Sequence, residues 1–298
     1  MTEATIPFRK EMKFEYGAAV QVSPLIRRIV AKNPSPFTLY GTNTYIVGRG
    51  EVAVIDPGPA IPEHVDALVR ALPGERVTHI LVTHTHMDHS PGASLLRQAI
   101  DGQIVGALPR PLPSGAPPVE SIQSDFAPDI HIADGARVAG PGWTLEAVYT
   151  PGHMSNHHCF ALAEEAALFT GDHVMGWNTS IVSPPDGNMR EYLASLARCM
   201  ARDDAIYWPG HGPEIVAPRG YVRALQGHRR MRESEIRDCI AKGATTIPQM
   251  VAIMYRHLPE NMHRAAARAV LAHLEHMVET GRAMTEGSVT ADSAFRLP

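Results

Sequence analysis

The chain has 298 residues, of which 44% are hydrophobic, and its 27 basic and 31 acidic side chains give a formal net charge of −4. This length suits one large domain with a smaller one, and the apolar content is that of an ordinary globular protein. The negative balance disfavours a broadly basic nucleic-acid-binding surface, and no run of about 18 apolar residues predicts a membrane-spanning helix.

The N-terminus and the cysteines bear on the cellular compartment. Residues 1–5 include an acidic side chain and no apolar core, so we expect no secretion signal. The three cysteines, Cys159, Cys199 and Cys239, are widely spaced and odd in number, which predicts neither a disulfide framework nor a zinc ribbon. We therefore expect a cytoplasmic protein with reduced thiols.

The first third of the chain predicts β-strands. Short runs rich in branched apolar residues cover 18–22, 25–30, 42–47 and 51–55. The turn Gly48-Arg49-Gly50 joins the last two runs and predicts a hairpin. Helices are predicted over 62–72, with Pro62 in the first turn, and over 91–100. Strands that alternate with helices to about residue 217 predict a layered α/β domain.

The segment from 107 to 142 is rich in proline, which excludes long regular helices or central strands. Its prolines are Pro109, Pro111, Pro113, Pro117, Pro118, Pro128 and Pro141. Two interpretations stay open, a surface loop and a lid over a functional site.

The C-terminal part predicts three helices and a short polar tail. The helices cover 221–241, 246–257 and 261–280, with Thr246 as a cap and Gly281 as a terminator. We therefore predict two domains, a larger one over 1–219 and a small helical module over 220–298.

The most informative stretch is His84-Thr85-His86-Met87-Asp88-His89, which follows a predicted strand over 77–82. A loop at a strand end can direct several side chains at one point. Neutral imidazoles and a carboxylate together suit zinc, and also iron or manganese.

Three further segments repeat this arrangement of an apolar run, a glycine turn and one metal-type ligand. His153 follows the run 143–149, Asp172 follows 166–169, and His211 follows 205–208. Glycine lets the backbone turn sharply, so a short side chain can reach inward from a strand end. Four such segments in one chain predict a metal centre.

These segments, from about Asn43 to Gly212, resemble the metallo-β-lactamase superfamily in its hydrolase branch. The resemblance implies an αββα sandwich, in which two mixed sheets are flanked by helices. It also implies two Zn²⁺ ions, with Mn²⁺ or Fe²⁺ as alternatives. The implied first-site ligands are His84, His86 and His153. The implied second-site ligands are Asp88, His89 and His211, and Asp172 would bridge both ions.

The C-terminal helices resemble the winged-helix-like module of one subgroup, called β-lactamase-like protein 2. The segments 36–45, 183–187 and 228–233 carry the same resemblance, which then covers nearly the whole chain after residue 30.

Several other residues are candidates for support of the ligands or contact with substrate. The resemblance implies that Asp56 supports a ligand, although a turn-forming role is equally open. Thr83 can hydrogen-bond a ligand, with a simple β-strand role as the default interpretation. Trp177 and Asn178 follow Asp172 closely and are expected near the metals, and ordinary core packing is equally open for Trp177. His157 is a candidate pocket residue, but relatives more often have threonine and acidic residues around this position, which leaves the chemistry of the pocket open.

Two arginines, Arg229 and Arg232, fall on an apolar helical stripe within a basic run. We predict that they face another surface, such as an anionic substrate. A solvated helix face is the alternative.

The sequence is interpreted as a binuclear metal-dependent hydrolase, in which a metal-bridging hydroxide attacks an ester or thioester and Asp88 and Asp172 serve catalysis. A metal-dependent endoribonuclease on single-stranded RNA, a lactonase and an iron-dependent oxidoreductase are alternatives, and so is a non-catalytic nucleic-acid-binding module. A small acyl substrate is favoured over RNA, because the net charge is negative and no aromatic platform accompanies the basic run. No membrane partner is expected, and the oligomeric state stays open, with a homodimer as one option.

Overall fold

The computed structural model describes residues 6–112 and 114–298. Residues 1–5, on which the expectation of no secretion signal rests, and Pro113 of the proline-rich segment lie outside the described residues. In the part of the chain that the structure describes, none of the helices combines the length and the apolar character that crossing a lipid bilayer requires.

The first sheet has seven strands that lie in chain order. They are β1 (Val20–Gln21), β2 (Ile26–Val30), β3 (Asn43–Arg49), β4 (Glu51–Ile55), β5 (Arg76–Leu81), β6 (Gln103–Gly106) and β7 (Ile130–His131). Strands β1 to β4 pair antiparallel, and the predicted hairpin is confirmed by the pairing of Arg49 with Glu51 across Gly50. Strands β4 to β7 are parallel, so α1 (Pro62–Arg70) and α2 (Gly92–Ala99) carry the chain back between β4, β5 and β6.

The second sheet has six strands, in the order β13-β12-β11-β10-β9-β8. They are β8 (Arg137–Gly140), β9 (Trp143–Tyr149), β10 (His158–Leu162), β11 (Ala167–Gly171), β12 (Ile206–Pro209) and β13 (Ile215–Val216), with the 3-10 turn η1 (Ala163–Glu165) between β10 and β11. Only β11 and β12 pair parallel, and α3 (Met189–Met200) connects them. The Asn188 side chain starts α3 by accepting a hydrogen bond from the amide of Glu191.

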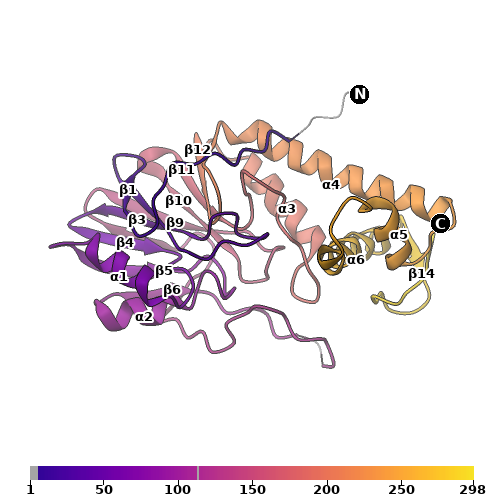
Figure 1. Cartoon of the computed structure of the whole chain (residues 1–298), viewed down its shortest axis with the longest axis horizontal. Coiled ribbons are helices and arrows are strands. Elements are labelled where there is room, and N and C mark those ends of the chain that lie inside the picture. Colours follow the sequence, from indigo (N-terminus) through magenta and orange to yellow (C-terminus); the bar gives the residue numbers. More distant parts are fainter. Residues whose placement is uncertain (1–5, 113) are drawn as a thin grey trace.

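The two sheets pack face to face, and helices cover both outer faces (Figure 1). Alternation along β3 places Tyr45 and Val47 between the sheets and Ile46 on the outer face, against α1 and α2. Residues such as Phe160 and Phe169 fill the inner layer from the second sheet. The predicted αββα sandwich is confirmed.

The C-terminal part contains α4 (Pro218–Ala241), α5 (Ile247–Met254), the 3-10 turn η2 (Glu260–Met262) and α6 (His263–Glu279). The three predicted helices are confirmed, and Thr246 and Gln249 form a capping box at α5. The predicted short polar tail contains a small antiparallel sheet, β14 (Met284–Thr285) with β15 (Phe295–Arg296). Strands of two residues are too short to show periodicity in the sequence.

Helix α4 belongs to two hydrophobic cores. In Figure 1 it extends from the sandwich to the C-terminal helices. Val222 and Leu225 pack with α3 and the second sheet, whereas Ile236 and Ile240 pack with α5 and α6. The domain boundary predicted between residues 219 and 220 falls in the first turn of α4, and it stays a prediction.

Candidate metal centre

The residues of the polar cluster follow the ends of four strands and lie at one edge of the sandwich. The segment from His84 to His89 follows β5, His153 follows β9, Asp172 follows β11 and His211 follows β12. Strands β9, β11 and β12 run in the same direction in the second sheet, because β10 is antiparallel to both of its neighbours. Their carboxyl ends therefore meet, and the segment after β5 faces them from the first sheet.

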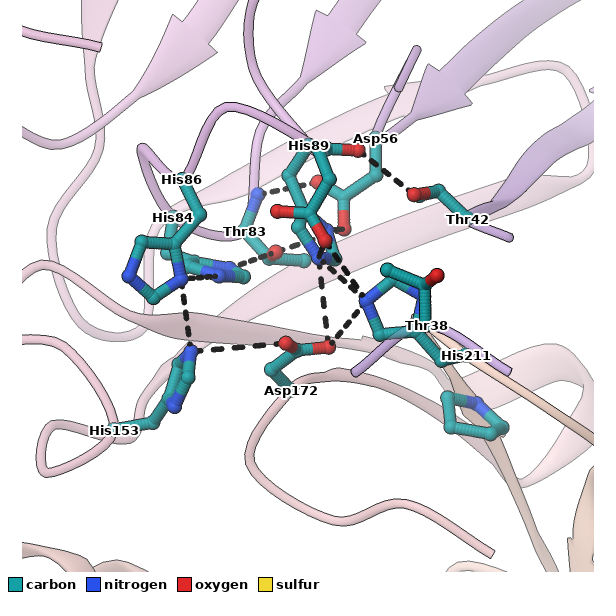
Figure 2. Close-up of polar contacts among 12 residues, drawn as sticks. Thr38, Thr42, Asp56, Thr83, His84, His86, His89, His153, Asp172 and His211 are labelled. Atoms are coloured by element: carbon teal, nitrogen blue, oxygen red, sulfur yellow. Dashed lines mark hydrogen bonds and ion pairs between the residues drawn. The ribbon is translucent and has the colours of Figure 1, made fainter. Parts of the chain in front are cut away.

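The seven predicted ligands converge as two groups. Figure 2 labels all of them except Asp88. In the first group, His86 Nδ1 lies 3.0 Å from Nε2 of both His84 and His153. In the second group, His211 Nε2 lies 3.2 Å from His89 Nε2 and 3.2 Å from Asp88 Oδ2. Within each group the facing atoms lie within 4.8 Å of one another, a spacing that one cation can span.

Asp172 lies between the two groups. Its Oδ2 is 3.7 Å from His153 Nε2 in the first group. Its Oδ1 is 3.3 Å from His211 Nε2 and 3.4 Å from His89 Nε2 in the second. One carboxylate oxygen therefore faces each group, as a bridging ligand requires.

The protonation of these side chains fits cation binding. Burial lowers the pKa of His84 well below its ordinary value and that of His86 to about 3, so both rings offer a neutral nitrogen lone pair. Asp172 Oδ1 is buried, and Nε2 of His211 and of His89 lie 3.3 and 3.4 Å from it. Burial opposes protonation of His211, but Asp172 and Asp88 outweigh it and raise the pKa of His211 to about 9; with Asp56 they also outweigh the burial of His89 and raise its pKa well above its ordinary value. The carboxylates therefore draw positive charge into the second group, where a cation would take the place of these protons. Imidazole nitrogens that face each other beside a buried carboxylate form a donor set that suits two divalent cations.

Asp56 holds ligands of both groups in place through hydrogen bonds. Its Oδ1 accepts from the Thr83 amide, and its Oδ2 accepts from the Thr83 hydroxyl and from His89 Nδ1, each at 2.8 Å. Because the Thr83 hydroxyl donates to Asp56, its oxygen can accept from His84 Nδ1 at 2.9 Å. Both histidines then hold a proton on Nδ1, which directs Nε2 at the position that a cation would occupy.

His157 lies next to the cluster, with its ring centre 5.1 Å from that of His84, and has no exposed surface with which to line a pocket. It is fully buried, with Nδ1 2.9 Å from the Thr150 hydroxyl, and its Nε2 accepts from the Asp172 amide at 3.2 Å. Burial lowers the pKa of His157 well below its ordinary value, which keeps the ring neutral and Nε2 an acceptor. His157 therefore positions the backbone of Asp172.

The other two candidates near Asp172, Trp177 and Asn178, have different surroundings. Trp177 packs against Gly212, where a Cβ atom would lie only 2.6 Å from the indole ring, so it supports the turn that carries His211. Asn178 is exposed and accepts a hydrogen bond from the amide of Thr179. Two further ligands are oriented by backbone carbonyl groups, which the sequence does not reveal. His153 Nδ1 contacts the carbonyl oxygen of Ile181, and His211 Nδ1 contacts that of Gly41.

The structure does not bring Arg229 and Arg232 to the cluster. Arg229 is buried, donates to the carbonyl of Ser180 and lies over the ring of Tyr192 at 4.9 Å. Arg232 pairs with Glu235 at 2.7 Å and lies 5.0 Å from the ring centre of Tyr255. Their contacts are internal, and this corrects the expectation that they face an anionic substrate.

A cavity of about 800 Å³ opens onto the cluster through His86, Asp88, His153 and Asp172. Residues 117–121 of the proline-rich segment form part of its wall, and α6 supplies Arg264 and Arg268. No sequence pattern marks these two arginines, because nothing in their spacing distinguishes them from a solvated helix face.

Comparison with known proteins agrees with this geometry. Residues 37–211 match the family model of the metallo-beta-lactamase superfamily, and residues 246–292 match the beta-lactamase associated winged helix domain. An atrochrysone carboxyl ACP thioesterase of Cryptosporiopsis is 32% identical over 85% of this chain and 76% of its own length. A beta-lactamase-like protein 2 homolog of Caenorhabditis elegans is 33% identical over 72% of this chain and 71% of its own.

A solved structure also shares the fold. A beta-lactamase domain protein from Burkholderia ambifaria aligns with a TM-score of 0.82 over 100% of this chain and 98% of its own, at 21% identity. The fold and the His/Asp cluster together suggest a binuclear metal site. This chain belongs to the metallo-beta-lactamase superfamily of enzymes, with a C-terminal winged-helix domain.

Proposed function

We propose that the protein is a binuclear, zinc-dependent hydrolase of acyl thioesters. The observation that carries the proposal is the convergence of two donor groups on one carboxylate at the floor of a cavity. Relatives named as acyl carrier protein thioesterases, at 32% identity over about four fifths of this chain or more, favour a thioester over other acyl compounds.

The proposed ligands are His84, His86 and His153 for one ion and Asp88, His89 and His211 for the other, with Asp172 shared. When bound, two such cations would supply Lewis-acid polarisation of a carbonyl and a water molecule acidified to a pKa of roughly 7. Asp172 would offset the repulsion between the cations, since each of its oxygens faces one group.

Asp88 has a second proposed role. Its side chain is 29% exposed and lines the cavity, whereas the histidines of its group are fully buried. A carboxylate in this position can accept a hydrogen bond from the attacking water and orient it toward the substrate carbonyl. The apolar side chains of the cavity, such as Met154 and Ile181, would exclude bulk water from the acyl group.

The endoribonuclease alternative loses part of its support in the structure. Its expected phosphate contacts were Arg229 and Arg232, whose guanidinium groups make internal contacts. Cleavage of single-stranded RNA that depends on the metal and weakens with salt would restore this alternative.

The test is a metal titration coupled to thioester hydrolysis. Protein prepared without chelators should contain about two zinc ions per chain, since the donor set divides into two half-sites. Hydrolysis of an acyl N-acetylcysteamine thioester should stop after chelation and return when zinc is restored. A stoichiometry of one iron per chain with oxygen consumption would instead establish the redox alternative.

A further inference from the structure

Two arginines of the C-terminal module share a cavity with the metal-type ligands. Arg264 and Arg268 lie four residues apart on α6, so they project from the same face of the helix. Both line the cavity that His86, His153 and Asp172 also line. The larger predicted domain therefore supplies the end of the cavity where the proposed metal ligands lie. The C-terminal module supplies a positively charged wall.

One carboxylate faces this wall. The Nη2 atoms of both arginines contact the same oxygen, Oε1 of Glu120, which belongs to the proline-rich segment. Two guanidinium groups against one carboxylate leave an excess of one positive charge. Among the other described acidic residues around the cavity, Asp88 and Asp172 belong to the metal-type cluster, and Asp186 accepts from the amide of Ser155.

The segment that carries Glu120 is hydrogen-bonded to the loop of residues 84–89, which holds four of the proposed ligands. The carbonyl of Ser121 accepts from the Met87 amide at 2.7 Å, and the amide of Gln123 donates to the Thr85 carbonyl at 2.8 Å. Ile122 forms a bridge with His86. Glu120 is thus held at the cavity wall by its neighbours in the chain, independently of the two arginines.

A purely structural role explains this contact poorly. The side chains of Arg264, Arg268 and Glu120 are 75%, 30% and 46% exposed, and exposed ion pairs contribute little to stability. Paired guanidinium groups instead match the geometry of phosphate and carboxylate groups, to which they donate several hydrogen bonds. Glu120 then occupies the place that an anionic ligand would take.

We propose that Arg264 and Arg268 bind an anionic group, a phosphate or a carboxylate, on the acyl thioester substrate, and that this group displaces Glu120 from the arginines. The proposal rests on the thioesterase function proposed above and specifies its substrate as negatively charged away from the scissile bond. The charged group lies on the thiol side or on the acyl side of the substrate, and the two cases are separated by the substrates below.

Three thioesters test the proposal. Butyryl-coenzyme A carries phosphates on the thiol side, glutaryl N-acetylcysteamine carries a carboxylate on the acyl side, and butyryl N-acetylcysteamine is neutral. Arg264→Ala with Arg268→Ala should lower kcat/KM for at least one charged thioester by about tenfold or more relative to the neutral one, mainly through KM. Glu120→Gln should shift the same ratio in the opposite direction, because it removes the competing carboxylate. Arg190→Ala, which removes an exposed pair with Glu279, is the matched control and should leave the ratio unchanged.

The same variants separate substrate binding from folding. An equal loss on all three thioesters, or no loss on any, would overturn the proposal, provided that the zinc content and the circular dichroism of the double variant match those of the native protein. If the native protein hydrolyses none of the three, the proposed thioesterase function fails, and calorimetric titrations with coenzyme A and with glutarate then decide the anion site. Binding of either compound that disappears in the double variant supports the site, and absence of binding of both to the native protein rejects it.

Discussion

Replacing Asp56 with asparagine should weaken zinc binding without unfolding the protein. Asp56 has a φ of +49°, a left-handed conformation that asparagine tolerates, so the backbone is not strained by the change. The side chain keeps its shape but exchanges one acceptor oxygen for an NH2 donor. Three buried donors, the Thr83 amide, the Thr83 hydroxyl and His89 Nδ1, now depend on that carboxylate.

The consequence for His89 follows from its tautomer. If the new amide nitrogen takes the place of Oδ2, it donates to His89 Nδ1 and moves the ring proton to Nε2, which faces Asp172 and His211. A protonated Nε2 cannot bind a cation. If the amide turns over, its nitrogen faces the Thr83 amide, so that two donors meet at the 2.8 Å spacing of the original hydrogen bond.

Loss of such a supporting contact typically lowers metal affinity by about 10–100-fold, or roughly 1.4–2.7 kcal/mol. The second group should lose more affinity than the first, because Asp56 contacts His89 directly but reaches His84 only through Thr83. Competition with a fluorescent zinc chelator would resolve the two affinities. Asp134→Asn is the control, since Asp134 accepts from the Tyr149 amide and from Arg198, outside the metal-type cluster. Two unchanged affinities in Asp56→Asn would refute the orienting role assigned to this carboxylate.

Five further substitutions test other contacts of the chain. Asp172→Ala should remove both zinc ions and nearly all turnover, whereas His211→Ala should retain the first ion. Equal zinc contents in the two variants would argue against a bridging carboxylate. Arg229→Ala should lower the free energy of unfolding by about 2–4 kcal/mol, since it removes a buried hydrogen bond to Ser180 and the stacking on Tyr192. Arg232→Ala should change that free energy by less than about 1 kcal/mol in urea denaturation, because its pair with Glu235 is partly exposed. Burial would raise the pKa of Glu233, but His273, His276 and Arg282 outweigh it and hold that pKa well below its ordinary value. Glu233 therefore stabilises the fold above the unfolded-state pKa of about 4.3, and this contribution is lost as the pH falls further toward the folded-state pKa. The Tm difference between the native protein and Glu233→Gln should be full at pH 7 and shrink below pH about 4; a difference that is constant with pH would contradict this role.

Much of the metal centre could be predicted because its residues carry a local signal. His84, His86, Asp88 and His89 lie within six positions, and His153, Asp172 and His211 each follow a glycine at a strand end. Those patterns, together with the family resemblance, were enough to identify the seven residues that the structure brings together. The sandwich was predictable for a related reason, since alternating apolar residues mark the strands.

The cavity could not be predicted in the same way, because its walls depend on contacts between distant segments. Glu120 and Arg264 are 144 positions apart, and no periodicity connects them. Arg229 illustrates the opposite error. An arginine in an apolar helical stripe indicates a specific contact, but the sequence does not tell whether that contact is a substrate or, as here, a carbonyl group and an aromatic ring.

The continuity of α4 has a consequence for how the molecule opens. One uninterrupted helix carries Val222 and Leu225 into the core beneath the second sheet and Ile236 and Ile240 into the core of the C-terminal module. If either core unfolds, it releases one half of α4, and the other core then loses part of the helix that it packs against. The amide protons in the middle of α4, around His228, should therefore exchange with solvent only when the entire protein unfolds, and they should be among the slowest to exchange in the chain.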